Sequence, residues 1–172
     1  KRDIWLTSGG FDPLHVGHLR CIQDTALMAT NPVKYPSQLK GFVVVLVNCD
    51  NFLINKKGYA FMPLEERMEI INGIKGVDAV LPWPLVDKED TTVINAILEL
   101  RPKVFTKGGD RIDQSTIPEW SACKQVGCEL ITGVGGEKIQ SSSELVEKAT
   151  DIEAAEVIGY AMGFTDGKNE SN

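Results

Sequence analysis

The chain has 172 residues, of which 42% are hydrophobic and 24% are charged. This length and composition suit a soluble globular protein with one well-packed domain rather than two. The formal net charge of −6 and the pI near 5.0 give no reason to expect nucleic acid or a membrane surface as a partner, so an anionic substrate would have to be bound by locally gathered lysines and arginines.

The cysteines indicate a reducing environment. The four cysteines are Cys21, Cys49, Cys123 and Cys128. They form no Cys-x-x-Cys pair, and most of them lie in apolar segments. Free thiols are therefore expected, and a protein-bound metal site is not. The first residues lead directly into an apolar run, and no stretch of about 18 apolar residues occurs. We therefore expect a cytoplasmic protein without a signal peptide or a membrane span.

A glycine- and histidine-containing turn connects the first predicted strand, Ile4–Leu6, to a helical pattern over Leu19–Met28. The turn covers residues 9–18, and its two leading glycines let backbone amides approach a ligand. The helix starts near His15, where free N–H groups and the helix dipole favour an anion. His15 and His18 share one helix face and can both contact that anion. The alternative is that they are capping or core histidines.

Strand and helix patterns alternate along the rest of the chain. Further strands are predicted at Phe42–Val47, Val77–Leu81, Lys103–Lys107 and Glu129–Thr132. Helices are predicted at Met62–Ile71 and Thr91–Leu100, from the capping box Thr116–Glu119 to Val126, and from the capping serines Ser141–Ser143 onward. A loop is predicted at Ile54–Tyr59. This alternation predicts an α/β fold, a Rossmann-like doubly wound five-stranded parallel sheet in a single domain. If the first and fourth strands are neighbours, the histidine turn and Gly108–Asp110 face one crevice.

The domain is predicted to cover residues 1–150. An extra C-terminal helix over residues 151–165 would pack either back on the domain or across a homodimer, and residues 166–172 would form a flexible tail. The polar loop at residues 30–40 is either a tolerated surface insertion or an element of specificity or dimerisation.

The turn has the pattern Gly-x-Phe-Asp-x-x-His-x-Gly-His, which resembles the signature of the cytidylyltransferase-like nucleotidyltransferases. The resemblance extends from Trp5 to about Lys148, and Lys107–Asp110 looks most like the adenylyltransferase domain of bacterial heptose-phosphate enzymes. Glycerol-3-phosphate cytidylyltransferase is a more distant relative. Other segments fall in the order found in sugar-phosphate nucleotidyltransferases: Asn48–Asp50, Lys57–Gly58, Pro63–Met68 and Ser141–Ser143.

This resemblance implies in-line attack by the phosphate of a sugar or polyol on the α-phosphorus of a nucleoside triphosphate, with Mg²⁺ assisting and pyrophosphate leaving. Because a phosphate monoester is already an anion, positioning and charge neutralisation would suffice without a strong base. ATP is favoured over CTP. The alternatives are another acceptor (pantetheine phosphate, nicotinate mononucleotide or FMN) and a non-catalytic nucleotide-binding protein.

The resemblance also implies roles for particular residues. His15 and His18 would contact the triphosphate, Lys57 would bridge the two reacting phosphates, with Lys56 as the second candidate, and Arg67 would reach an anionic group. The alternatives are solvated loop lysines and a surface ion pair of the arginine with a glutamate of its own helix. The expected nucleotide-binding residues are Gly10, Phe11, Asp12, Gly17, Lys56, Lys107, Gly108, Gly109, Asp110, Ser141, Ser142 and Ser143.

Overall fold

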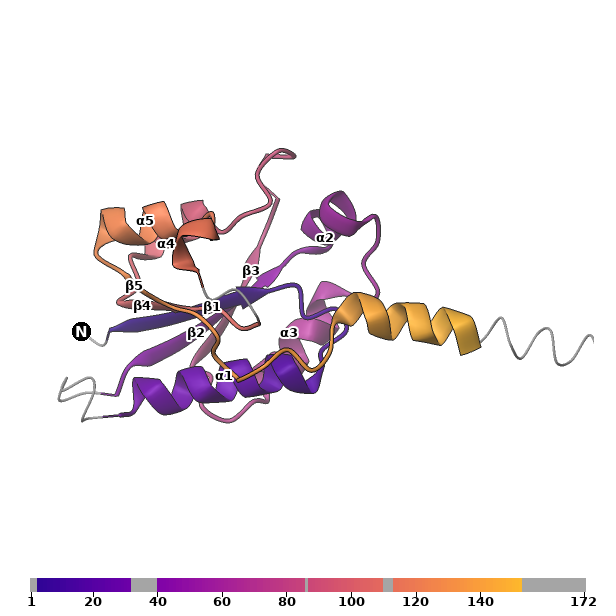
Figure 1. The fold of residues 1–172 in the computed structure, drawn as a ribbon, viewed down its shortest axis with the longest axis horizontal. Helices are drawn as coiled ribbons and strands as arrows, with labels where there is room; N and C mark the ends of the chain where they lie inside the picture. The colour runs from indigo at the N-terminus through magenta and orange to yellow at the C-terminus, as the bar shows by residue number, and fades with distance from the viewer. Residues whose placement is uncertain (1–2, 32–39, 86, 110–112, 153–172) are drawn as a thin grey trace, which may run out of the picture.

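The structure, a computed structural model, describes residues 3–31, 40–85, 87–109 and 113–152. They form a five-stranded parallel sheet with the order β3-β2-β1-β4-β5 (Figure 1). The expected doubly wound sheet is confirmed, with β1 and β4 as neighbours. The strands are β1 (Ile4–Gly9), β2 (Phe42–Asn48), β3 (Ala79–Trp83), β4 (Val104–Thr106) and β5 (Glu129–Ile131).

Helices cover both faces of the sheet. In Figure 1, α4 and α5 lie above the sheet, whereas α1 and α3 lie below it. The helices are α1 (Val16–Ala29), α2 (Asp50–Lys57), α3 (Leu64–Asn72), α4 (Ile94–Leu100) and α5 (Trp120–Val126), with a 3₁₀ helix η1 (Gln114–Thr116). Residues 142–152 are also helical, and we call them helix 142–152.

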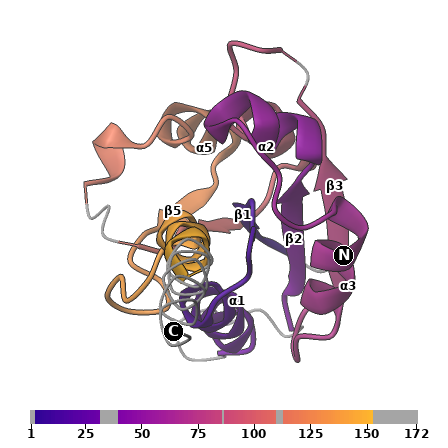
Figure 2. The same cartoon turned by 90° about the vertical axis from the view of Figure 1, so that its right-hand side faces the viewer.

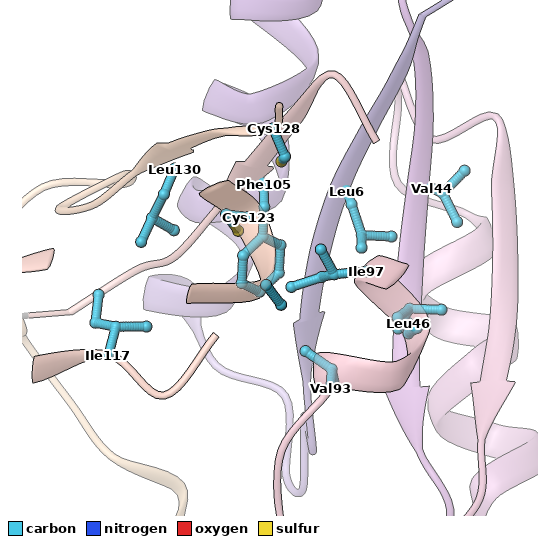
Figure 3. Close-up of a cluster of buried hydrophobic side chains, with 12 residues drawn as sticks. Leu6, Val44, Leu46, Val93, Ile97, Phe105, Ile117, Cys123, Cys128 and Leu130 are labelled. Carbon is cyan, nitrogen blue, oxygen red and sulfur yellow. The ribbon is translucent and has the colours of Figure 1, made fainter. Parts of the chain in front are cut away.

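Hydrophobic packing on both faces of the sheet explains the continuous apolar run of β2. Successive side chains of a strand point to opposite faces, so Val44 and Leu46 pack into the core beneath α4 and α5 (Figure 3). Val45 packs on the other face with Ile22 of α1 and Ile71 of α3. Because both faces are covered, a central strand of this sheet needs apolar residues at every position.

The strand β3 begins and ends two residues later than predicted and includes Pro82. It lies at the edge of the sheet and pairs only with β2. A residue without an N–H is tolerated on an edge strand because one side of that strand needs no hydrogen bonds.

The prediction of a loop at Ile54–Tyr59 is wrong over its first four residues, because α2 continues to Lys57. Two buried side chains, Phe52 and Leu53, anchor this short helix. Gly58 ends it in the left-handed region, with φ of 87° and an N–H that donates to the Ile54 carbonyl at 2.8 Å. One pair of adjacent anchors gives no helical periodicity, whereas the glycine is the usual helix stop.

Several expectations concern residues that the structure does not describe. They are Asp110, the loop at 32–39, the tail at 166–172 and the C-terminal extension, of which only 151 and 152 are described, both helical. Within the described residues, no helix combines the length and apolarity needed to cross a bilayer.

Candidate active site

A cavity of about 410 Å³ lies at the carboxyl ends of β1 and β4. Its size lies within the range of small-molecule sites. The cavity brings the histidine turn and Gly108–Gly109 together, as expected from the order of the strands. The predicted site residues that line it are Phe11, His15, Gly17, His18, Lys56, Lys107, Gly108, Gly109, Ser141 and Ser142.

The two histidines form the N-terminal cap of α1. His15 precedes the first helical residue, and its Nδ1 accepts a hydrogen bond from the Gly17 amide at 3.1 Å. The His15 amide in turn donates to Nδ1 of His18 across a longer distance of 3.4 Å. A side chain at Gly17 would place its Cβ only 3.0 Å from Cε1 of His15. The capping alternative considered from the sequence therefore holds, and both rings also line the cavity.

The two rings are stacked, with centroids 3.7 Å apart and planes inclined by 20°. The Phe11 ring meets the His18 ring edge-on at 5.1 Å. Burial and the neighbouring His15 lower the pKa of His18 to about 4. Burial also lowers the pKa of His15, against a smaller opposing effect of Glu144. Both imidazoles are therefore neutral at pH 7.

The paired glycines of the turn serve packing. A Cβ at Gly9 would lie 3.1 Å from the Phe11 ring, and one at Gly10 would lie 2.8 Å from a methyl group of Leu53 in α2. Phe11 has a positive φ of 52°, which is rare for a bulky residue. Gly10 was expected to offer its amide to a ligand, but it is not part of the cavity lining.

Asp12 holds Lys57 beside the histidine turn. The Asp12 side chain is 1% exposed, and its Oδ2 lies 2.8 Å from Nζ of Lys57. The carboxylate also accepts hydrogen bonds from the amides of Phe61 and Met62 at 2.8 and 2.6 Å. Burial alone would raise the pKa of Asp12, but these bonds lower it overall. Neither Asp12 nor Lys57 lines the cavity, whereas Lys56 does.

Arg67 is buried and binds backbone carbonyls and Asp50 inside the protein, contrary to the expectation that it reaches an anionic ligand. Its side chain is 0% exposed. The guanidinium donates to the carbonyls of Met62, Gly10 and Asn48 at 2.9, 2.6 and 2.8 Å. It also pairs with Oδ1 of Asp50 at 2.5 Å. The alternative prediction, a surface ion pair with a glutamate of its own helix, is also wrong, because the guanidinium is buried and its hydrogen bonds go to these groups.

The segment after β4 passes close to α1. Lys107 lines the cavity, and its Nζ lies 2.9 Å from Oε2 of the buried Glu119. A Cβ at Gly108 would lie 3.3 Å from both Sγ of Cys21 and the Val134 carbonyl. A larger residue there would press on Cys21 of α1 and on the Val134 carbonyl, so glycine suits the close packing between the segment and α1.

The sequence-based prediction missed the loop after β5. Residues 134–140 line the cavity. Gly135 has a φ of 90°, and a Cβ there would lie 2.6 Å from the backbone nitrogen of Cys21. The signal was present in the three glycines of residues 133–136, which permit a backbone conformation and a close approach that other residues cannot adopt.

The lining gathers positive charge in a chain whose net charge is −6. It includes Lys56, Lys107 and Lys138, and Glu137 is its one carboxylate among the described residues. This imbalance favours an anionic ligand.

A second helix begins at the cavity. Ser141 Oγ accepts from the Glu144 amide at 3.2 Å, which confirms the predicted cap, and Ser142 Oγ donates to the Pro13 carbonyl at 2.9 Å. Ser143 is exposed and does not line the cavity. Figure 1 shows that helix 142–152 begins at the same end of the sheet as α1. In Figure 2, seen from that end, helix 142–152 points toward the viewer and α1 is drawn below it. Both N-termini favour an anion there.

The family model described as cytidylyltransferase-like matches residues 6–148. The chain is 30% identical over 136 residues to the bifunctional protein HldE of Hahella chejuensis, covering 78% of this chain and 23% of that protein. The corresponding protein of Pseudomonas syringae pv. syringae is 27% identical over 161 residues, covering 86% and 28%. That of Coxiella burnetii is 30% identical over 147 residues, covering 84% and 27%.

The chain therefore spans about a quarter of the length of these relatives. A solved structure described as the lipopolysaccharide core biosynthesis protein from Thermoplasma volcanium matches with a TM-score of 0.57 and 18% identity, covering 77% of this chain and 96% of that chain. At this identity the likeness concerns the fold.

Proposed function

This chain belongs to the cytidylyltransferase-like family of nucleotidyltransferases, and on that premise we propose that it transfers a nucleoside monophosphate from a nucleoside triphosphate to the phosphate of a sugar or polyol. One observation carries the proposal: two helix N-termini, two histidines and three lysines converge on one cavity. The preference for ATP over CTP rests on the similarity of the segment beginning at Lys107 to heptose-phosphate adenylyltransferases.

The lining residues suit phosphoryl chemistry of this kind. An oxygen of the acceptor phosphate forms a bond to the α-phosphorus, and the bond from that phosphorus to the bridging oxygen breaks, releasing pyrophosphate. His15 and His18 contact the triphosphate at the start of α1, while Ser141 and Ser142 present the start of helix 142–152. The lining lysines offset the charge that develops on the leaving group.

Magnesium is proposed to arrive with the nucleotide. Within the described residues, no group of three histidine, cysteine, aspartate or glutamate side chains could hold a metal ion. The lining offers Glu137 as its carboxylate. Mg²⁺ commonly keeps its waters and binds through substrate phosphates plus one or two carboxylates, so these residues fit an ion held chiefly by the triphosphate. The ion would neutralise phosphate charge.

The test is pyrophosphate release in the presence of Mg²⁺. Each of ATP, CTP, GTP and UTP is combined with sugar 1-phosphates, glycerol 3-phosphate, pantetheine phosphate, nicotinate mononucleotide and FMN. We expect release with ATP and a sugar or polyol phosphate. Release with CTP in place of ATP would overturn the nucleotide preference, and release only with one of the other acceptors would overturn the acceptor class.

A matched control separates this chemistry from a contaminating activity. The His18→Ala variant should lose about a hundred- to thousand-fold of turnover, the usual effect of removing a preorganised donor, while its circular dichroism spectrum stays that of the original protein. A thermal-shift screen of the four nucleotides identifies the one that binds, because a ligand stabilises the folded state by mass action. Full turnover by a folded His18→Ala variant would contradict the proposed mechanism.

A further inference from the structure

The side chain of Asn48, the last residue of β2, carries a buried oxygen without a hydrogen-bond donor. The residue is 7% exposed. Its backbone carbonyl accepts from the Arg67 guanidinium at 2.8 Å, but among the residues that the structure describes no donor reaches the side-chain Oδ1. A buried acceptor without a donor costs stability, and an apolar side chain of the same shape would avoid that cost. Stability therefore does not explain an amide at this position.

The alternation of side chains places Asn48 on the face of the sheet that α4 and α5 cover. Val44 and Leu46 of the same strand pack into the core on this face (Figure 3). A side chain two residues further along a strand points the same way. Asn48 therefore follows Leu46 on this face, at the carboxyl end of β2.

The same alternation in the neighbouring strands shows that Asn48 lies beside the cavity. In β1, Ser8 follows Leu6, which belongs to the core on this face. Directly after β4, Lys107 follows Phe105, which belongs to the same core. Ser8 and Lys107 both line the cavity, and Asn48 is not itself part of the lining. The three side chains lie on one face, at the carboxyl ends of three adjacent strands, with Asn48 nearest to β3.

This part of the site differs in charge from the part at the histidine turn. Lys107 is already paired, because its Nζ lies 2.9 Å from Oε2 of Glu119, whose side chain is 5% exposed. The amide oxygen of Asn48 accepts hydrogen bonds from N–H and O–H groups, and an ionised phosphate oxygen offers it no donor. The part of a substrate that suits this place is therefore uncharged and carries hydroxyl groups.

We propose that Oδ1 of Asn48 accepts a hydrogen bond from a hydroxyl group of the sugar or polyol acceptor and so selects which acceptor is used. This inference rests on the proposed function and goes beyond it by naming the part of the acceptor that is recognised and the residue that recognises it. The last torsion of an asparagine side chain is soft, so the amide can rotate to bring Oδ1 to the bound hydroxyl. An acceptor that lacks this hydroxyl leaves the oxygen unpaired and is rejected for that reason.

The first test is the stability of Asn48→Leu, because leucine has the shape of asparagine without its polar atoms. We expect a Tm equal to that of the original protein or up to about 4 °C higher, since the variant removes an unpaired buried oxygen. A Tm that falls by more than about 2 °C would show that the amide stabilises the fold and would overturn the inference.

The second test is isothermal titration calorimetry with glucose 1-phosphate, glycerol 3-phosphate and inorganic phosphate. We expect at least one of the two organic phosphates to bind the original protein about tenfold or more tightly than it binds Asn48→Leu. Inorganic phosphate should bind both proteins equally, because it has no carbon chain with hydroxyl groups. Binding of neither organic phosphate to the original protein, equal binding to both proteins, or an equal loss for inorganic phosphate would overturn the inference.

Deoxy analogues of the organic phosphate that binds identify the hydroxyl. We expect one analogue to bind the original protein about tenfold more weakly than the parent compound does. The same analogue and its parent should bind Asn48→Leu equally, because the hydroxyl and the amide oxygen are coupled. Losses that simply add in the two proteins would overturn the inference.

Asn51→Leu is the matched control. Asn51 is exposed in α2, and its Oδ1 accepts from the Leu85 amide at 3.4 Å. We expect this variant to bind the organic phosphates as the original protein does. An equal loss in Asn51→Leu and Asn48→Leu would assign the effect to a general disturbance of this region and would overturn the inference.

Turnover separates this inference from the proposed function. If pyrophosphate is released and Asn48→Leu keeps the Michaelis constant of the original protein for the acceptor, the inference fails and the proposed function stands. If an organic phosphate binds through Asn48 but no mixture releases pyrophosphate, the proposed function fails and the recognition of the hydroxyl stands.

Discussion

At the scale of single residues, the ion pair of Asp12 and Lys57 gives the lysine a structural task. The buried carboxylate is fixed by two amides as well as by the lysine, so Lys57 stabilises the fold wherever it acts in the reaction. The resemblance assigns it to the reacting phosphates, and the structure places it next to the histidine turn. Both can be true if phosphates attract the amine away from Asp12.

We therefore expect Lys57→Met to lower both stability and turnover. The loss of a partner for a buried charged group should cost about 1–3 kcal/mol of unfolding free energy. If the lysine also acts in the transition state, kcat should fall much more than nucleotide affinity does. Urea unfolding and steady-state kinetics measure the two effects.

The matched control for this experiment is Lys56→Met. Lys56 is exposed, and it lines the cavity from the preceding position of α2. We expect it to change nucleotide affinity with little effect on stability. A Lys57→Met variant that is less stable but fully active would restrict Lys57 to its structural task and leave Lys56 as the lysine that α2 contributes to the site.

At the scale of elements, Arg67 connects the segments that surround the histidine turn. It comes from α3 and binds carbonyls at the end of β1, at the end of β2 and before α3, together with a carboxylate at the start of α2. Chain ends that carry a binding site have few backbone partners of their own. One planar side chain with five donors satisfies several of them together.

Arg67→Met should therefore destabilise the protein without acting on the phosphates directly. Leaving buried carbonyls without a donor should cost about 1–3 kcal/mol for each such group, measured by urea unfolding. At a temperature where the variant is folded, the Michaelis constant for the nucleotide should change less than in Lys138→Met, which removes a lining charge. A stable Arg67→Met variant with a large loss of nucleotide affinity would restore the ligand contact expected from the sequence.

At the scale of the whole molecule, the low pKa of His18 couples folding to pH. The folded pKa is about 4, below the ordinary value of 6.5, so the unfolded chain binds a proton between these values while the folded chain does not. The contribution is complete above about pH 6.5 and declines as the pH falls toward 4. The difference corresponds to about 3 kcal/mol. Urea unfolding between pH 7.5 and 4.5 should show this loss.

His18→Gln is the control, because glutamine at the third helical position can still reach back to the cap and does not titrate. Its stability should depend less steeply on pH than that of the original protein. Equal slopes for the two proteins would mean that His18 is not responsible for the pH dependence.

Local patterns were sufficient for the fold and for the centre of the site. The alternation of apolar runs and helical periods predicted a five-stranded parallel sheet because hydrophobic periodicity is set by neighbouring residues. The turn from Gly9 to His18 predicted an anion site for the same reason: its glycines, its helix start and its two histidines lie within ten residues. The cap at Ser141 is similarly local.

Contacts between distant segments decided what the remaining side chains do. Lys57 lies 45 positions from its partner Asp12, and Arg67 lies 57 positions from Gly10. Nothing in the local sequence distinguishes a lysine or arginine that faces a ligand from one that faces a buried carboxylate or carbonyl. Only the folded chain brings such partners together, and the energy of a buried polar group depends on whether it finds one.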